Sequence, residues 1–419
     1  MTQSVAAAAP GAAAASVEGR ASWVVAAAAL AILSFSYGAP YVTAVGLRPI
    51  AEELGSARSV PALAAALAWL GAGVGGMLMG WLAEKIGVRW TVLLGAVMVG
   101  AGLGISTVGG PWALWIGHGL FIGLLGNGGI NIPLMTYVTR WFDRRRGTAL
   151  ALIASGQYIA GVLWPAIFER GIAVYGWRAT MALFGAVVVV AVIPLAAWFL
   201  RPPPKPVPLA ASLGTLGSLR TPGALPRGFF PLLCCAPFLC CVPMAMPQGH
   251  LVAFCSDLGI TAARGAAMLS VMLGCAFVAR QFWGWLSDRI GGMMTVLAGS
   301  ACQILALVAF FLTQDETGLF IVAAGFGLGF SGIIPAYVLA VRDLFAAEEA
   351  GWRVPVVFFS GTGGMAFGGW AAGLIYDHFG TYSAAWAAGI GINAVHLLLV
   401  GALILYRAAG TGGSLRHSR

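Results

Sequence analysis

Twelve stretches of mostly apolar residues, each about 20 residues long, restrict the fold of this sequence more than any other feature. A helix of about 20 apolar residues is long enough to cross the hydrocarbon core of a bilayer. Only 9% of the 419 residues are charged, against about 25% in soluble domains. We therefore predict an all-α membrane protein with twelve transmembrane helices. The stretches are 23–47, 60–83, 89–108, 111–139, 147–168, 179–200, 229–254, 265–287, 293–313, 318–341, 354–376 and 383–406.

One connecting segment is long and differs from the others in composition. Residues 201–227 read RPPPKPVPLAASLGTLGSLRTPGALPR, and their proline, glycine and cations are typical of a solvated linker. This linker divides the chain into two units of six spans, at 22–200 and 228–407. We expect residues 1–21, which are Ala-rich and do not match a signal peptide, to form a disordered cytoplasmic tail. Residues 408–419 are expected to form a second cytoplasmic tail.

The positive charge of the chain is distributed unevenly around the predicted spans. With the N-terminus in the cytoplasm, 17 of the 23 Lys and Arg fall on the cytoplasmic side, five fall outside and Arg280 lies within a span. This is the positive-inside bias of membrane proteins, and it predicts that both termini are cytoplasmic. The net charge of +9 is therefore a topology signal, and it does not indicate a nucleic-acid-binding surface.

A short loop occurs twice, between the second and third span of each unit. GWLAEKIG at 80–87 recurs as GWLSDRIG at 284–291, and such internal duplication is common in secondary transporters. We interpret both loops as gates, in which glycines allow close helix approach, the acid faces a helix N-terminus, and the cation pairs with a loop acid such as Asp143 or Glu348. The alternative is a basic anchor in a tight turn. The candidate gate residues are Gly80, Glu84, Lys85, Gly87, Arg89, Gly284, Asp288, Arg289 and Gly291.

Arg280, in the stretch FVARQFWGWLSDRIG, is the one cation inside a predicted span. It precedes Asp288 by eight residues, which places it about 12 Å from the helix end. A charge at this depth normally has a partner, and none of the fourteen Asp and Glu lies deep in a span. We infer that an anionic substrate supplies the counter-charge, because the guanidinium fork suits a carboxylate. The alternative is a structural arginine hydrogen-bonded to tyrosine or backbone groups.

The duplicated loop resembles the signature of the major facilitator superfamily over residues 22–408, with Glu84 in place of the usual Asp. Arg280-x-x-x-Gly284, RWFDRRRGTALALIASGQ and MPQGHLVAFCSDLG resemble its monocarboxylate and oxalate/formate branch. The resemblance implies two pseudo-symmetric six-helix bundles, a cavity lined by spans one, four, seven and ten, and contact between Arg280 and a carboxylate. Proton-coupled relatives often carry an acid one turn earlier, where this chain has Ala276. No second buried cation is present in span eleven, which favours a monoanion.

Several polar residues in the middle of spans are candidates for lining this cavity, although each could instead form a helix-packing hydrogen bond. His250 is the candidate proton site, with an interfacial histidine bound to the backbone as the alternative. His118 and His396 are interpreted as packing residues. The candidate substrate-binding residues, besides Arg280, are Tyr37, Tyr41, Asn127, Asn131, Gln157, Tyr158 and Tyr337.

Span seven contains a group of soft ligands that could suggest copper(I) transport. Cysteine is also a small apolar residue at membrane depth, and the spacing matches no zinc motif and no disulfide framework. We therefore expect no bound metal and no cofactor. The residues of this alternative are Cys234, Cys235, Cys240, Cys241, Met244, Met246 and His250.

Glycines at four-residue spacing occur in spans two and eleven, which meet across the two units in this fold. Such small-residue rows let helices approach closely. We predict that they form a smooth seam along which the units slide. The rows are Gly71/Gly75, Gly76/Gly80, Gly364/Gly368 and Gly369/Gly373.

The sequence thus predicts a secondary transporter of a small organic anion, a monocarboxylate, working by proton symport or anion exchange. The alternative is an efflux pump for a drug or metabolite, but a pump for cations should carry an acid in the membrane. No phosphate-binding glycine loop is present, and no nucleophile with its base, so we do not expect an enzyme. We expect a multi-pass protein of a bacterial inner (plasma) membrane, with no obligate protein partner.

Overall fold

The computed structural model describes residues 18–202, 228–345 and 347–414, and these residues are almost entirely helical, with no strand among them. Helix occupies each of the twelve predicted stretches. The first half contains α1 (Arg20–Ser36), α2 (Gly38–Val45), α3 (Leu47–Glu53), α4 (Ser59–Ile86), α5 (Val88–Val108), α6 (Pro111–Ile116), the π-helical segment η1 (Gly117–Asn127), α7 (Gly128–Thr139), α8 (Arg146–Ala154) and α9 (Gly156–Phe199). The second contains α10 (Phe229–Asp257), α11 (Ala262–Ile290), α12 (Gly292–Leu312), α13 (Glu316–Phe330), α14 (Ile333–Leu344), α15 (Ala347–Phe379) and α16 (Tyr382–Ser414).

Within the described residues, ten helical stretches are long and apolar enough to cross a membrane. The longest, Gly147–Phe199, holds the fifth and sixth predicted spans. These two spans are separated at Gly176, whose φ of +79° interrupts the helix and is a conformation that favours glycine. The 33 residues of α15 cover the eleventh predicted span. The prediction of an all-α membrane protein is confirmed.

The predicted tails and linker lie mostly outside the described residues. At their edges, two boundaries differ from the prediction. Helix α1 already begins at Arg20, inside the predicted tail 1–21, and α16 continues to Ser414, past the predicted end at 407. Ala408 and Ala409 are good helix formers but the three glycines that follow are not, so helix propensity alone does not explain the extension to Ser414.

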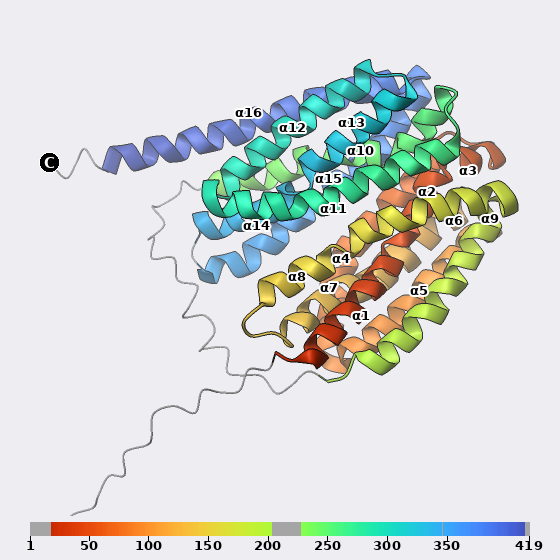
Figure 1. Cartoon of the computed structure of the whole chain (residues 1–419), viewed down its shortest axis with the longest axis horizontal. Coiled ribbons are helices and arrows are strands. Elements are labelled where there is room, and N and C mark those ends of the chain that lie inside the picture. Colours follow the sequence, from red (N-terminus) through yellow and green to blue (C-terminus); the bar gives the residue numbers. More distant parts are fainter. Residues whose placement is uncertain (1–17, 203–227, 346, 415–419) are drawn as a thin grey trace, which may run out of the picture.

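The helices form two groups that lie side by side, one coloured red to yellow-green and the other green to blue (Figure 1). In the first half, α4 packs on η1 and α5 on α9; in the second, α10 packs on α15 and α11 on α13. The halves meet where α4 runs along α15, α9 along α11, and α2 along α10. Spans two and eleven therefore do meet across the halves, as predicted.

Most of the predicted glycine rows do not form this seam, so that prediction is wrong in its detail. A Cβ added at Gly71 would lie 2.8 Å from the Leu124 nitrogen, inside the first half. One added at Gly364 would lie 2.9 Å from the Cys241 Cβ, inside the second half. Of the predicted residues, Gly373 does face the other half, where Ser59 Cα would be 2.9 Å from an added Cβ. Small residues are needed mainly where the helices of one bundle approach each other.

Several spans are interrupted near the middle of the bundle. Span one breaks at Tyr37, between α1 and α2, and span ten near Ser331, between α13 and α14. Close to these breaks, backbone carbonyls accept indole N–H groups: Trp164 Nε1 donates to Ser34 O at 2.9 Å, and Trp283 Nε1 donates to Leu328 O at 2.6 Å. Backbone groups at membrane depth need such partners because no bulk water is available there.

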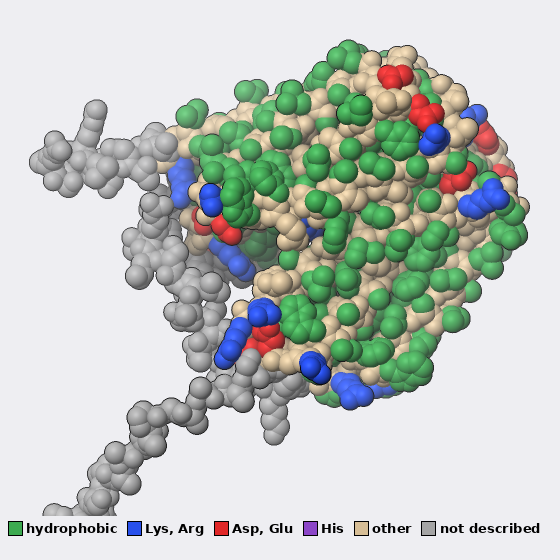
Figure 2. All heavy atoms as spheres, viewed as in Figure 1, with side chains coloured by type: hydrophobic (Ala, Val, Ile, Leu, Met, Phe, Trp, Pro, Cys, Tyr) green, Lys and Arg blue, Asp and Glu red, His purple; other side chains and the backbone are tan. Residues whose placement is uncertain are grey.

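The outer surface is largely apolar and the two ends of the molecule differ (Figure 2). Exposed side chains such as Trp81, Leu305 and Leu398 suit contact with lipid tails. At one end, which we call the basic end, Arg145 lies against Glu18 and Tyr137 donates to the carbonyl of Arg201. The surface between the halves is hollowed at this end, with charged side chains around the rim (Figure 2). We call the opposite end, where the halves touch, the closed end.

Candidate functional site

Arg280 lies where the two halves meet. Its guanidinium carbon is 5.3 Å from the ring centroid of Tyr158, which belongs to α9 of the first half. Helices α9 and α11 come this close because Gly161 has no side chain to hold Leu273 away. A cation–π contact contributes about 0.5 to 2 kcal/mol, depending on how far it is desolvated.

No carboxylate of the protein neutralises Arg280 in the part of the chain that the structure describes. Seven ion pairs form there, each with a nitrogen and an oxygen within 4.0 Å of each other. None of the seven involves Arg280. The side chain is only partly buried, so it is reachable from the space between the halves. Arg280 therefore lacks a carboxylate partner among the described residues, while its contact with Tyr158 is also what the structural alternative predicts.

A pocket lies between the halves, and Arg280 is not among the residues that line it. Three of the predicted residues, Tyr37, Tyr41 and Gln157, line it. Two further residues, Trp69 and Gln248, were not predicted. Gln248 is an amide in the middle of an apolar span, the same signal that identified Gln157, so it could have been found from the sequence. The other lining residues are Pro40, Ala44, Ala65, Ala66, Ala245, Gly249, Met365 and Gly369.

Asn127 and Asn131 do not line this pocket. Both are buried, and their side-chain oxygens lie 2.6 and 3.3 Å from the Ser36 hydroxyl. A single hydroxyl hydrogen can serve one of them at a time. The two asparagines thus connect span four to span one within the first half, which is the helix-packing role given above as the alternative.

Tyr337 points into the second half instead of the pocket. Its hydroxyl lies 2.6 Å from His396 Nε2, and His396 Nδ1 lies 2.7 Å from the hydroxyl of Ser300. Asn393 completes this buried cluster by accepting from the same hydroxyl at 2.7 Å. The position of His396 agrees with the packing role predicted for it, and Tyr337 belongs to the same core.

His250 is buried near the closed end and both of its ring nitrogens have partners. Nε2 lies 2.7 Å from the carbonyl of Gly369, and Nδ1 lies 3.0 Å from the hydroxyl of Tyr382. A carbonyl can only accept, so Nε2 carries the hydrogen and Nδ1 of the neutral ring accepts from Tyr382. His250 therefore joins α10 to α15 and α16.

The cysteines and methionines of span seven do not converge on one point. Cys235 is exposed, whereas Cys240 and Cys241 are buried. Cys240 lies 3.9 Å from the side-chain oxygen of Gln303, and His250 is engaged by Tyr382 and Gly369. Among the described residues, no group of three or more His, Cys, Asp or Glu could hold a metal ion. The geometry gives no support to the copper alternative.

The two copies of the duplicated loop have matching geometry. Lys85 lies over the ring of Trp81 at 3.8 Å, and Arg289 over the ring of Trp285 at 4.1 Å. Each loop ends at a glycine with positive φ, +90° at Gly87 and +80° at Gly291. Both conformations favour glycine, which explains why the residue is present in both copies.

The predicted gate differs from the structure in one detail, and its ion pairs stay a prediction. The acid Glu84 lies 3.9 Å from Arg140 of span four, within the first half. A Cβ added at Gly80 would make only an ordinary contact of 3.9 Å with Ile132, and one added at Gly284 would meet nothing within 4 Å, so neither glycine is needed for a close helix approach here. Arg89 and Asp288 are exposed, and the side chain of Glu348 lies outside the described residues.

These features describe a membrane protein built from two packed helical halves around a central polar site. The profile of the Major Facilitator Superfamily matches residues 24–351, and the chain belongs to this family, whose members are transporters and not enzymes. Monocarboxylate transporter 11 of Mus musculus is 27% identical over 356 residues, 83% of this chain and 71% of that protein. MFS transporter asaE of Aspergillus flavus is 22% identical over 318 residues, 74% of this chain and 69% of that protein.

Solved structures resemble the whole chain in fold. A bacterial homologue of the human lysosomal transporter Spinster has a TM-score of 0.71 at 13% identity, covering 95% of this chain and 98% of that one. The peptide transporter POT in complex with sulfate has a TM-score of 0.71 at 15% identity, covering 93% and 95%. At these identities the likeness concerns the fold alone. The chain spans about two thirds of the length of the first curated relatives.

Proposed function

We propose that this transporter moves a small organic anion, a monocarboxylate, by alternating access, with Arg280 as the group that binds the carboxylate. One observation carries the proposal: a partly buried arginine at the interface of the halves, without a carboxylate partner among the described residues. An arginine offers a carboxylate two parallel charge-assisted hydrogen bonds. The names of relatives, monocarboxylate transporters 11 and 13 among them, support the same substrate class.

The pocket between the halves favours at most one charge on the substrate. Alanine, glycine, methionine and tryptophan make up most of its lining, and its described lining residues include no cation, Arg280 lying outside them. A second carboxylate would be desolvated here without a partner, at a cost of several kcal/mol. We infer an acid whose remainder is apolar. Tyr37, Tyr41, Gln157, Tyr158 and the newly found Gln248 would contact it.

The basic end is proposed to be the cytoplasmic end, which places both termini inside. This orientation follows from the positive-inside bias and makes the hollow of Figure 2 an opening toward the cytoplasm. The duplicated loops lie at this end, and we propose that they form the inner gate when the hollow closes. The pair of Glu84 with Arg140 would then stabilise the first half during that movement.

The test is uptake of radiolabelled small carboxylates into proteoliposomes by the wild type, Arg280→Ala and Arg280→Lys. Removing a charged hydrogen-bonding group costs about 3 kcal/mol, a factor of about 100 in KM or in uptake at low substrate. We expect Arg280→Ala to lose at least this factor. Arg280→Lys, which keeps the charge but not the fork, should lie between.

The matched control is Arg264→Ala. Arg264 lies on the same helix, α11, but at its outer end, where it pairs with Glu316 at 2.9 Å. Uptake by this variant should stay within about twofold of the wild type, because exposed ion pairs contribute less than 1 kcal/mol. Unchanged uptake by Arg280→Ala would show that the arginine is structural, and the proposal would be wrong.

One observation favours the alternative of drug or metabolite efflux: the mostly apolar lining of the pocket would also accept a larger apolar solute. The two functions differ in direction and in substrate. Efflux predicts accumulation of such a solute in inside-out vesicles and no accumulation of small acids in vesicles of the opposite orientation.

A further inference from the structure

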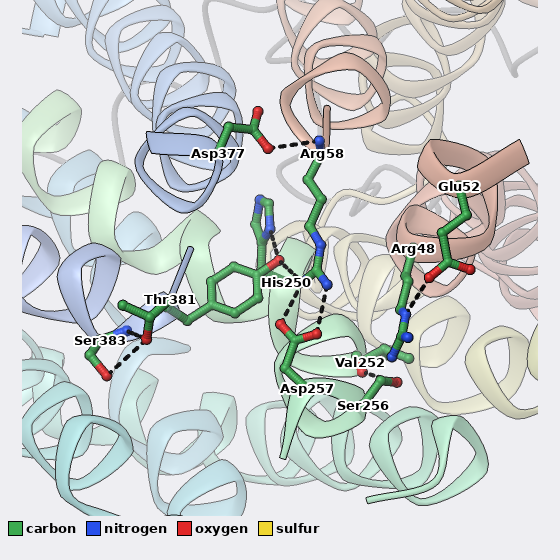
Figure 3. A network of polar contacts seen from close by, with 11 residues as sticks. Arg48, Glu52, Arg58, His250, Val252, Ser256, Asp257, Asp377, Thr381 and Ser383 are labelled. Atoms are coloured by element: carbon green, nitrogen blue, oxygen red, sulfur yellow. Dashed lines mark hydrogen bonds and ion pairs between the residues drawn. The ribbon is translucent and has the colours of Figure 1, made fainter. Parts of the chain in front are cut away.

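The closed end is held by an arginine that reaches from one half to the other (Figure 3). Arg58, directly before α4, donates two hydrogen bonds of 2.6 Å to the two carboxylate oxygens of Asp257, at the end of α10. The side chains are only 12% and 24% exposed, so water screens this pair less than a surface pair. Burial opposes the charge of Arg58, but the bonds to Asp257 and Tyr382 raise the pKa of its guanidinium above the usual value.

A second carboxylate caps helix α4 from the opposite half. The oxygens of Asp377, in the last turn of α15, accept the backbone N–H groups of Arg58 at 2.8 Å and Ser59 at 2.9 Å. No side chain of the first half caps this helix start. The free N–H groups and the positive end of the helix dipole both favour a carboxylate at this position. The start of α4 is therefore completed only while the halves touch.

Ring contacts and a glycine allow this close approach. The Arg58 guanidinium carbon lies 3.8 Å from the ring centroid of Tyr376, and its Nη1 lies 3.3 Å from the hydroxyl of Tyr382. At Gly373, one turn before Asp377, an added Cβ would lie 2.9 Å from Ser59 Cα. A larger residue there would separate the start of α4 from α15.

Ion pairs between described residues join the halves at this end alone. Of the seven, Arg58–Asp257 is the one whose partners belong to different halves. At the basic end, Arg140–Glu84 lies within the first half and Arg353–Glu349 within the second. Electrostatic attraction between the described residues therefore favours the state that is closed here and open at the basic end.

We propose that Arg58, Asp257 and Asp377 form a latch that sets the resting state of the transporter with the closed end shut. Tyr382 positions Arg58 from the second half. His250 binds both Tyr382 and the carbonyl of Gly369, and Gly369 lines the pocket, so a continuous chain of hydrogen bonds connects the latch to the pocket. Opening of the closed end requires all bonds of the latch to break together. The inference does not depend on the identity of the substrate.

The experiment measures the distance across the closed end without any substrate. Spin labels are attached to cysteines introduced at Val108 and Leu312, the closed-end termini of α5 and α12, in a chain whose seven native cysteines are replaced. We expect the unaltered latch to give mainly the shorter distance. Asp257→Asn and Asp377→Asn each weaken charge-assisted bonds, so the ratio of longer to shorter distances should rise about 10- to 100-fold. Tyr382→Phe, which removes one neutral acceptor, should raise it by less than about 10-fold.

Two further variants test the reasoning. Glu316→Gln breaks the pair with Arg264 at the same end but within the second half, and it should leave the distances unchanged. Gly373→Ala crowds the interface without removing a charge and should populate the longer distance. The proposal is overturned if both aspartate variants, still monodisperse after purification, keep the wild-type distances, or if Glu316→Gln shifts them equally.

Discussion

Two adjacent glycines of α15, Gly368 and Gly369, provide a test of how the halves are packed. A Cβ at Gly368 would lie 2.6 Å from Val242 Cα of α10 and closer still to the Val242 carbonyl oxygen, whereas a Cβ at Gly369 would meet nothing within 4 Å. We predict that Gly368→Ala destabilises the protein and that Gly369→Ala does not.

The size of the effect follows from these distances. Ordinary contact begins at about 3.4 Å, so α10 and α15 would have to separate by at least 0.8 Å at Val242 (3.4 minus 2.6). The obstacle is backbone, which cannot move aside as a flexible side chain can. Overpacking of this kind costs about 3 kcal/mol, and alanine returns about 1 kcal/mol through its better helix propensity. The net loss for Gly368→Ala is about 2 kcal/mol, while Gly369→Ala gains up to about 1 kcal/mol.

Thermal unfolding of the purified protein in detergent measures the difference. A loss of about 2 kcal/mol lowers the midpoint of thermal unfolding by about 4–8 °C for a folding unit of about 150–250 residues, which is the size of one half. Gly369→Ala should match or exceed the wild-type midpoint. Uptake well below the midpoint should be retained by Gly368→Ala, because the contact lies inside the second half and does not have to slide during transport.

Two results would refute this reasoning. Equal midpoints for the two alanine variants would mean that α10 and α15 do not touch at Gly368. A normal midpoint with lost transport in Gly368→Ala would place that glycine at the moving interface, as the glycine rows in the sequence had suggested.

Two other side chains give predictions that differ in kind: one concerns proton coupling and the other concerns stability. His250→Gln keeps a donor for the Gly369 carbonyl but cannot take up a proton. If the coupling proton binds at His250, this variant should lose uptake driven by an inward proton gradient and keep exchange of labelled for unlabelled substrate. Intact gradient-driven uptake would contradict the role of His250 as proton site. Tyr337→Phe should leave the KM for uptake unchanged. It should lower the free energy of unfolding by about 1 kcal/mol, because it leaves His396 Nε2 without a partner. Thermal unfolding and uptake, measured on one preparation, distinguish this outcome from a role in substrate binding.

The fold was predictable because its main signals are local. Apolar length and the repeated loop each occupy a short stretch, and each reports one physical requirement. The ends of helices were less predictable. Helix α16 continues past its apolar stretch to Ser414, so hydropathy alone does not decide where this helix stops.

The sequence separated pocket-lining polar residues from helix-packing ones less well. The direction in which a residue faces depends on helix breaks, and hydropathy does not show these breaks. Tyr37 and Tyr41 share a face and both line the pocket. Asn127 and Asn131 have the same four-residue spacing, yet both face Ser36. Span four contains the π-helical segment η1, which ends at Asn127, and its wider turn changes the direction in which these two residues face.

Arg280 and Arg58 show why one arginine was identified from the sequence and the other was not. A charge in the middle of an apolar stretch is costly wherever the neighbouring helices lie, so Arg280 stands out in the sequence alone. Arg58 lies in a loop among other charges, where an exposed cation costs nothing, and its importance comes entirely from Asp257 and Asp377, 199 and 319 residues away. Such pairs depend on how the halves are oriented, and alternating access changes that orientation. The contacts that decide which end is open therefore leave the weakest signal in the sequence.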